Sequence, residues 1–332
     1  MPGYPKVNYI GNKEKLASWI IGEFPVKSGT VLDLFGGGCS VAYALKESGY
    51  SVVVNDILYA DYVLGKALIE NQDATLPEAV FSYHPDPARV KELTERFSFL
   101  SERLYYPEET EELARLAALA DALPEGERYL FLALLRRAMI RKLPYSRMNV
   151  PWDQIRILRD EEYSYRKYGR RRAYHNQSFE SHMRENLEAY NAAVFAGRPC
   201  RACRMDAFSM AEAAGPVDAV YLDPPYPSTM NQYDDFYGLF DEMFGLRRGH
   251  ADFTKRETFL ANLEELVRLL RQKAGYLVLS QNTRVKPGPD QIAAMLEAYG
   301  SVSIREKKHN YQVTGKENKN GSRELLFLVR FR

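Results

Sequence analysis

Two short apolar runs flank a segment with helical spacing, and this pattern most constrains the fold. Residues 30–35 (TVLDLF) and 51–56 (SVVVND) are near-continuous apolar runs, which predict strands buried on both faces. Residues 41–48 between them predict a helix, and residues 57–71 predict another. The sequence therefore predicts a β-α-β-α unit that opens a doubly wound α/β sheet.

The strand pattern stops after this unit and resumes near the C-terminus. Apolar residues recur with helical spacing in most of residues 73–199, which predicts an inserted, mostly helical module. Strands are predicted again at residues 217–222 and 275–280, and the last two form an antiparallel pair at 302–309 and 324–331. We predict a discontinuous α/β domain from residues 1–72 and 200–332.

Composition is ordinary for a globular protein, with 45% hydrophobic and 27% charged residues. No apolar stretch approaches the about 18 residues that span a bilayer, and the start of the chain lacks a signal-peptide pattern. Three cysteines in a chain of 332 residues favour a reducing compartment, so we expect a cytoplasmic protein. Cys200 and Cys203 have no second ligand pair, so we interpret them as ordinary thiols near a turn and predict no metal site.

The net charge of +1 conceals a strong local asymmetry. Residues 131–204 contain 16 Lys or Arg against 7 Asp or Glu, an excess of nine positive charges. A basic stripe of this kind is typical of a protein that binds a phosphate-rich partner. A solvated surface with no partner is the alternative interpretation.

A glycine-rich loop follows the first predicted strand. Residues 36–38 (GGG) stand between a strand and a helix, where a backbone without Cβ atoms lies close to a ligand. Asp56 ends the next strand, where nucleotide-binding sheets place an acid for ribose hydroxyls. Neither GxGxxG nor GxxxxGK[ST] is matched, so we predict a nucleoside ligand without a pyrophosphate. A tight turn with a capping acid remains an alternative.

The segment VYLDPPY joins a carboxylate, two prolines and an aromatic ring at the end of a predicted strand. Asp223 and the carbonyl of Pro224 are two acceptors with no donor between them, which suits a planar NH2 group. Tyr226 offers a ring on which a flat base can stack. The alternative is a proline turn with a capping Asp and a buried Tyr.

Three motifs in this order, YIGNK at 9–13, DLFGGG at 33–38 and DPPY at 223–226, resemble the Dam-like α-class of adenine-N6 DNA methyltransferases. The resemblance implies a Rossmann-like methyltransferase sheet, S-adenosylmethionine as cofactor and a target-recognition module at residues 73–199. It implies methyl transfer to the N6 amine of a flipped adenine in a specific sequence of double-stranded DNA. Cytosine N4, an RNA adenine, a protein glutamine amide and a catalytically idle DNA-binding relative are the alternatives.

The resemblance also assigns roles to residues of the motifs. Asp223, Pro224 and Tyr226 would be catalytic, and Asp206 would meet the adenine amino group of the cofactor. Ala207 precedes Phe208, so the residue that packs on that adenine stays open. The implied cofactor contacts are Tyr9, Gly11, Lys13, Asp33, Phe35, Gly36, Gly37, Gly38, Asp56, Asp206, Phe208 and Asp223.

Residues 163–178 (YSYRKYGRRRAYHNQS) are the predicted DNA contact, because they combine cations for phosphates with aromatic and amide groups for bases. A solvated basic loop is the alternative. We assign Arg136 and Arg137 to the same face, and we expect a monomer whose further partner is a cognate restriction endonuclease. The predicted DNA-binding residues are Arg141, Lys142, Arg147, Arg166, Lys167, Arg170, Arg171, Arg172, Lys316 and Lys319.

Overall fold

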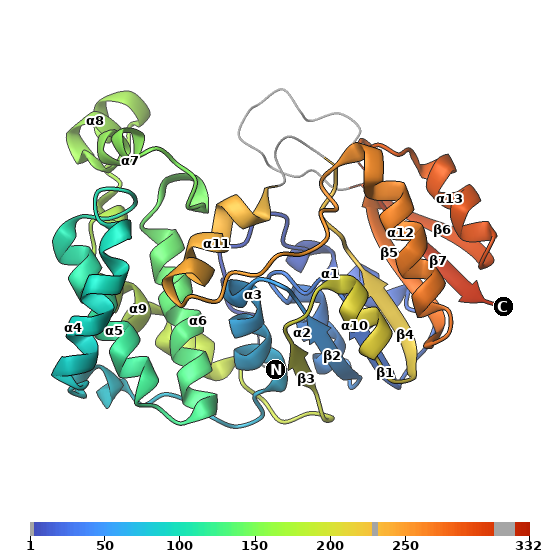
Figure 1. Cartoon of the computed structure of the whole chain (residues 1–332), viewed down its shortest axis with the longest axis horizontal. Coiled ribbons are helices and arrows are strands. Elements are labelled where there is room, and N and C mark those ends of the chain that lie inside the picture. The colour runs from blue at the N-terminus through green and yellow to red at the C-terminus, as the bar shows by residue number, and fades with distance from the viewer. Residues whose placement is uncertain (1–2, 228–231, 309–322) are drawn as a thin grey trace. The chain divides into compact units, whose positions relative to one another are not determined.

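The computed structural model describes residues 3–227, 232–308 and 323–332, and its internal contacts divide into two compact units (Figure 1). The α/β unit consists of Gly11–Ile57, Gly197–Tyr233 and Arg248–Arg332. The helical unit consists of Met1–Ile10, Leu58–Ala196 and Asp234–Arg247.

These units follow boundaries different from the predicted 1–72, 73–199 and 200–332. Residues 58–72 and 234–247 group with the helices although they adjoin strands in sequence. The reason is packing, since the helix after the second strand lies against the longest helix of the predicted insertion. Contacts among distant segments, rather than chain order, define the helical unit.

The α/β unit contains a seven-stranded sheet in the order β3-β2-β1-β4-β5-β7-β6 among the described residues. The first five strands of that order are parallel, and β7 runs antiparallel to both β5 and β6. The predicted doubly wound α/β fold is therefore confirmed. The strands are β1 (Thr30–Asp33), β2 (Ser51–Asn55), β3 (Arg201–Cys203), β4 (Val217–Leu222), β5 (Ala274–Asn282), β6 (Gly300–Lys308) and β7 (Arg323–Phe331).

Helices accompany the sheet within the same unit, with α10 and α12 lying across its strands in Figure 1. Leu32, Val220 and Leu277 belong to one buried core with the apolar sides of α10, α12 and α13. Successive strand residues face opposite sides, so Asp33 points away from that core, toward the face where α2 begins. The helices of this unit are α1 (Glu14–Gly22), α2 (Ser40–Glu47), α10 (Ala207–Ala213), α12 (Arg256–Leu270) and α13 (Pro289–Glu297).

Strand β3 was not expected from the sequence. Its three residues, Arg201–Cys203, pair with β2 only, at the edge of the sheet. The strand is too short and too polar to show a strand pattern, so the interpretation of Cys200 and Cys203 as lying near a turn missed it. Neither thiol forms a disulfide bond, and the buried Cys39 forms none either.

The helical unit packs around α6, in which every residue from 130 to 140 is buried. Helices α3, α5 and α9 all contact α6, which explains why this stretch of the helix has no exposed side. Its α-helices are α3 (Tyr59–Leu64), α4 (Pro87–Phe97), α5 (Pro107–Asp121), α6 (Glu125–Arg141), α7 (Trp152–Arg159), α8 (Glu161–Tyr168), α9 (Phe179–Ala192) and α11 (Tyr233–Met243). A π-helical turn spans Gly65–Glu70, and short 3-10 turns span Glu78–Ser82, Ser98–Leu100, Pro144–Ser146 and Ala173–His175.

In the described part of the chain, no helix is both long and apolar enough to cross a membrane.

Candidate functional site

Three carboxyl side chains lie at the carboxyl ends of three adjacent parallel strands. Asp33 ends β1, Asp56 follows β2 and Asp223 follows β4, and β1 lies between the other two. In open α/β sheets, ligands bind at the carboxyl ends of the strands, and this side of the sheet is called the sheet edge below. The structure therefore places all three predicted acids at one edge of the α/β unit.

Asp33 is the most buried of the three, with 1% of its surface exposed. Burial, together with the negative charges of Asp223 and Asp56, raises the pKa of the Asp33 carboxyl to about 8. Its Oδ1 is buried and has no hydrogen-bond partner among the described residues. An unsatisfied, charge-crowded carboxyl group favours a cationic ligand, which would lower this pKa.

The glycine-rich loop is held against β2 by its backbone. Gly37 has a φ of 47°, and its N–H donates to Asp56 Oδ2 at 2.8 Å. Gly36 N–H donates to the carbonyl of Asn55 at 2.8 Å, and a Cβ at Gly36 would lie 2.5 Å from Val54 Cγ2. Glycine is therefore required by the left-handed turn at Gly37 and by the close approach to β2 at Gly36.

Asp223 is held by a lysine from the start of the chain. Lys13 Nζ lies 2.8 Å from both Oδ1 and Oδ2 of Asp223, and the Tyr226 hydroxyl donates to Oδ1 at 3.0 Å. The Lys13 side chain is 5% exposed and that of Asp223 is 19% exposed. Lys13, predicted to contact the cofactor, thus has the carboxylate of Asp223, the residue predicted to be catalytic, as a close partner. Pro224 is buried beside it.

Asp206 caps α10 and also ties down a distant loop. Its Oδ1 accepts from Phe208 N–H at 3.0 Å, and its Oδ2 accepts from Ala251 N–H at 2.9 Å. Phe208 stacks on Phe253 with ring centroids 6.0 Å apart, and Phe35 meets Phe253 edge-on at 5.2 Å. Ala207 is buried. The half-buried Phe208 is therefore the better candidate for packing on a flat base.

Three residues of this site were missed by sequence reasoning. Phe253 connects the two predicted phenylalanines, and its only signal was an aromatic residue in the irregular stretch HADFTK. Asn55 donates to the carbonyls of Leu34 and Met205 at 3.2 and 3.0 Å, and so joins the ends of β1 and β2 to the segment before α10. Glu324 is a buried acid at the start of an apolar strand, and its charge in that setting was the available signal.

The first motif is divided between the two units. Gly11, in the α/β unit, has a φ of 83°, and a Cβ there would lie 2.7 Å from the Tyr233 hydroxyl, so glycine is required. Tyr9 belongs to the helical unit, where its ring stacks on Tyr237 at 5.0 Å. The guanidinium of Arg136 lies 5.0 Å from the Tyr237 ring centroid. The contacts that the structure gives for the Tyr9 ring are therefore packing contacts within the helical unit, and its predicted contact with the cofactor stays a prediction.

The predicted DNA-contact segment is largely accessible. Arg166, Lys167, Arg170 and Arg171 are exposed, and Arg172 is half-buried. The first two lie in the last turn of α8 and the others follow Gly169, which ends the helix in a left-handed conformation. A helix end with cations on short, exposed connections is suited to phosphate contacts.

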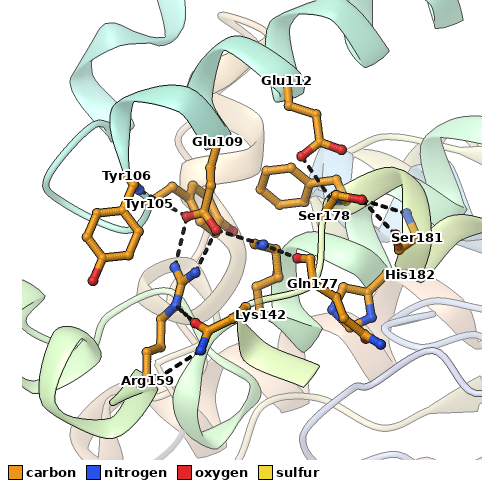
Figure 2. A network of polar contacts seen from close by, with 12 residues as sticks. Tyr105, Tyr106, Glu109, Glu112, Lys142, Arg159, Gln177, Ser178, Ser181 and His182 are labelled. Carbon is orange, nitrogen blue, oxygen red and sulfur yellow. Dashed lines mark hydrogen bonds and ion pairs between the residues drawn. The ribbon is translucent and has the colours of Figure 1, made fainter. Parts of the chain in front are cut away.

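Lys142 does not belong to this surface. Its side chain is fully buried, Nζ pairs with Glu109 Oε1 at 2.7 Å, and Nζ also donates to the carbonyl of Gln177. Figure 2 shows Glu109 between Lys142 and Arg159, whose guanidinium donates to both carboxylate oxygens at 2.6 and 2.8 Å. The prediction that Lys142 contacts DNA is therefore corrected: its charge compensates a buried carboxylate.

Arg136 and Arg137 are also interior residues rather than members of the basic face. Arg136 is fully buried, pairs with Asp61 at 3.0 Å and donates to the carbonyl of Val7 at 3.1 Å. Arg137 is 7% exposed and donates to the carbonyl of Lys6 at 2.6 Å. Both arginines connect α6 to other segments of the helical unit, which a count of charges along the sequence cannot distinguish from surface charge.

The remaining predicted cations are mixed. Arg141 is half-buried, with its guanidinium 3.8 Å from the Tyr174 ring centroid. Arg147 is half-buried, and its guanidinium lies 5.7 Å from the Tyr145 ring centroid. Lys316 and Lys319 lie outside the described residues.

Comparison with known proteins identifies the family of this chain. The chain belongs to the D12 class of N6 adenine-specific DNA methyltransferases, whose family model matches residues 9–286. It is similar to the Type II methyltransferase M2.HphI of Haemophilus parahaemolyticus, with 46% identity over 340 residues that cover 99% of this chain and 98% of that protein. The predicted family is confirmed. The chain is an adenine-specific DNA methyltransferase, and membership in this class favours adenine N6 of DNA over the cytosine, RNA and glutamine acceptors.

Proposed function

We propose that this methyltransferase takes its methyl group from S-adenosylmethionine bound by the α/β unit and transfers it to a flipped adenine of double-stranded DNA. The observation that carries the proposal is the carboxylate of Asp223 at the carboxyl end of β4, beside Asp33 and Asp56. The roles of individual residues below belong to the same proposal.

The residues at the sheet edge fit this cofactor in charge and shape. S-adenosylmethionine carries a sulfonium and an ammonium group, and the unsatisfied Oδ1 of Asp33 lies near the carboxylates of Asp223 and Asp56, which attract cations. When bound, the cofactor supplies an electrophilic methyl group on its positively charged sulfur. Asp56 would accept from the ribose hydroxyls, and Phe208 with Phe35 would pack on the adenine ring.

Asp223 and Pro224 prepare the target amine. Oδ1 of Asp223 accepts from both Lys13 and Tyr226, whereas Oδ2 has only Lys13 as a partner among the described residues. Oδ2 therefore keeps an acceptor position for one amino hydrogen of adenine, and the Pro224 carbonyl would accept the other. These two bonds direct the nitrogen lone pair away from the ring and toward the methyl carbon. Transfer would break the bond between the methyl carbon and the cofactor sulfur, which leaves as a neutral thioether. The methylated amine, now positively charged, would then lose a proton and become N6-methyladenine.

Tyr226 fixes the base in this geometry. Its hydroxyl is anchored by Asp223 at 3.0 Å and accepts from Lys13 at 3.2 Å, so the ring has a defined orientation. Stacking on an aromatic ring stabilises a base that has left the helix, because the base loses its neighbours when it flips.

The exposed cations of α8 and the residues after it would neutralise DNA phosphates. The relative M2.HphI is named as a Type II methyltransferase. From this name we infer a restriction–modification role for the present chain, with a cognate endonuclease as partner. We further propose that the protein is cytoplasmic and acts as a monomer.

Asp223→Asn tests the proposal, because the amide keeps the shape but replaces acceptor capacity with N–H donors. We expect methyl transfer to fall by about 100-fold or more, while binding of S-adenosylmethionine survives at least in part, because Asp223 is only one of several predicted cofactor contacts. The rate of methyl transfer by the wild type and by Asp223→Asn is measured with labelled S-adenosylmethionine and unmethylated DNA. The DNA is digested to nucleosides, which are analysed for labelled N6-methyladenine. An undiminished rate in the variant would refute the role of Asp223, and no label transferred from this donor by the wild type would refute the proposed cofactor.

A further inference from the structure

Glu324 is a buried acid that none of the sequence motifs includes. It lies near the start of β7, opposite Asn282 of β5, with 0% of its surface exposed. A carboxylate removed from water destabilises a fold unless donors and an opposite charge compensate it. The partners of Glu324 therefore indicate why the residue is there.

Two of the side chains that contact Glu324 also contact Asp223. Glu324 Oε1 accepts from the Ser280 hydroxyl at 2.5 Å, lies 3.4 Å from the Tyr226 hydroxyl and lies 3.6 Å from Lys13 Nζ. Among the described residues, Lys13 and Tyr226 are the two side chains that contact Asp223. Glu324 is therefore linked to Asp223 through Lys13 and Tyr226, each of which contacts both carboxyl groups.

This arrangement shares one ammonium group between two carboxylates. Lys13 Nζ is 2.8 Å from Asp223 and 3.6 Å from Glu324, and the Lys13 side chain is 5% exposed. If Asp223 were its only carboxylate partner, the lysine would neutralise Asp223 and weaken it as an acceptor. The second carboxylate offsets part of the lysine charge, so that the pair Lys13–Asp223 stays electron-rich toward an amine.

The same carboxylate also restrains the aromatic ring. Tyr226 has its hydroxyl between Asp223 Oδ1 at 3.0 Å and Glu324 Oε1 at 3.4 Å. The single hydroxyl proton is shared between these two acceptors, which fixes the position of the phenol oxygen and so restrains the swing of the ring that would stack on the target base.

We propose that Glu324 is a positioning residue of the methylation reaction: it orients Lys13 and Tyr226 so that Asp223 remains a strong acceptor and the ring stays in place. It does not touch the base or the cofactor. This inference rests on the proposed roles of Asp223 and Tyr226.

Glu324→Gln is the central test, because glutamine keeps the volume and the contact with Ser280 but removes the negative charge. The single-turnover rate of N6-methyladenine formation should fall about tenfold or more, equivalent to about 1.4 kcal/mol in the barrier. Dissociation constants for DNA and S-adenosylmethionine should change less than about threefold. Glu265→Gln on α12, which breaks an exposed ion pair with Arg268 at 2.6 Å, is the matched control and should leave the rate unchanged.

Coupling to Tyr226 distinguishes positioning from a general loss of structure. The Tyr226→Phe variant lacks the hydroxyl but keeps the ring. In this background, Glu324→Gln should lower the single-turnover rate by a clearly smaller factor than it does in the wild type. Ser280→Ala provides a milder perturbation of Glu324 and should slow transfer by about threefold.

A rate within twofold of wild type in Glu324→Gln overturns the inference. So does a slower rate that is fully additive with Tyr226→Phe, or one matched by an equal loss of folded protein on thermal unfolding. Wild-type activity in the same assay tests the proposed function separately, so the two failures are distinguishable.

Discussion

Asp33 illustrates how burial and neighbouring charge change the chemistry of one residue. Its pKa is raised from 3.8 to about 8, first by burial and then by the carboxylates of Asp223 and Asp56. The backbone N–H groups of Phe35 and Ala42 oppose this rise but do not cancel it. At neutral pH the folded protein therefore holds a proton on Asp33 that the unfolded chain has lost, and folding is less favourable by the cost of binding it.

Asp33→Asn should stabilise the α/β unit at pH 7 by at least about 1 kcal/mol, because asparagine is already neutral. The gain should shrink as the pH falls toward 3.8, where both states of the wild type are protonated. Denaturant unfolding followed through Trp19, in a Trp152→Phe background, measures the α/β unit. Equal stability of Asp33→Asn and wild type at pH 7 would show that Asp33 is ionised in the folded protein.

At the scale of elements, cations in or just after α6, α7 and α8 differ in their burial and in their partners. Lys142 and Arg159 are buried on Glu109, whose pKa is lowered because these two cations outweigh the effect of burial. Arg170 and Arg171, a few residues beyond α8, are exposed. All four lie in one basic stretch of sequence, yet only the last two are available to a phosphate.

Replacing Arg170 and Arg171 with Ala should weaken DNA binding and reduce its salt dependence. Each lost phosphate contact lowers the slope of log affinity against log salt by about 0.9, so the change should be up to about 2. Arg268→Ala with Arg271→Ala on α12 is a matched control, since Arg268 has a surface carboxylate partner as Arg171 does. Fluorescence anisotropy at several salt concentrations gives the slope. An unchanged slope in the α8 variant would remove this segment from the DNA interface.

At the scale of the whole molecule, the two units contain buried groups with opposite responses to pH. In the helical unit, burial is the main cause that lowers the pKa of His175 to about 3 and of His182 to about 4. Positive neighbours, Arg172 for His175 and Lys142 for His182, add to the effect. In the α/β unit, the pKa of Asp33 is raised.

Acidification from pH 8 to pH 5 should therefore affect the units in opposite directions. Below pH 6.5 the unfolded chain protonates both histidines while the folded helical unit keeps them neutral, so that unit loses stability. Over the same range the folded α/β unit keeps its proton on Asp33, while the unfolded chain needs progressively less free energy to bind one, so this unit gains stability.

The two tryptophans, Trp19 and Trp152, report on these units separately. Thermal unfolding of Trp19→Phe follows the helical unit, and that of Trp152→Phe follows the α/β unit. Midpoints that shift in the same direction between pH 8 and pH 5 would contradict the opposite assignments of the histidines and Asp33.

The sequence by itself determined the parts that depend on local pattern. Apolar runs predicted strands β1, β2, β4 and β5, and the acids that end three of them lie at one sheet edge because parallel strands share their direction. The motifs around Asp223 and the glycine loop identified the family. These features follow from the order of residues alone, because strand period, turn chemistry and motif spacing are properties of short segments.

Only the tertiary structure decided how charged side chains are used. It placed Lys13 on Asp223, Glu324 behind both, and Lys142 in the interior on Glu109. It also gathered residues 58–72 and 234–247 with the helices. The physical reason is that the partners of a charged side chain come from segments distant in the chain, and its sequence neighbours do not specify which those partners are.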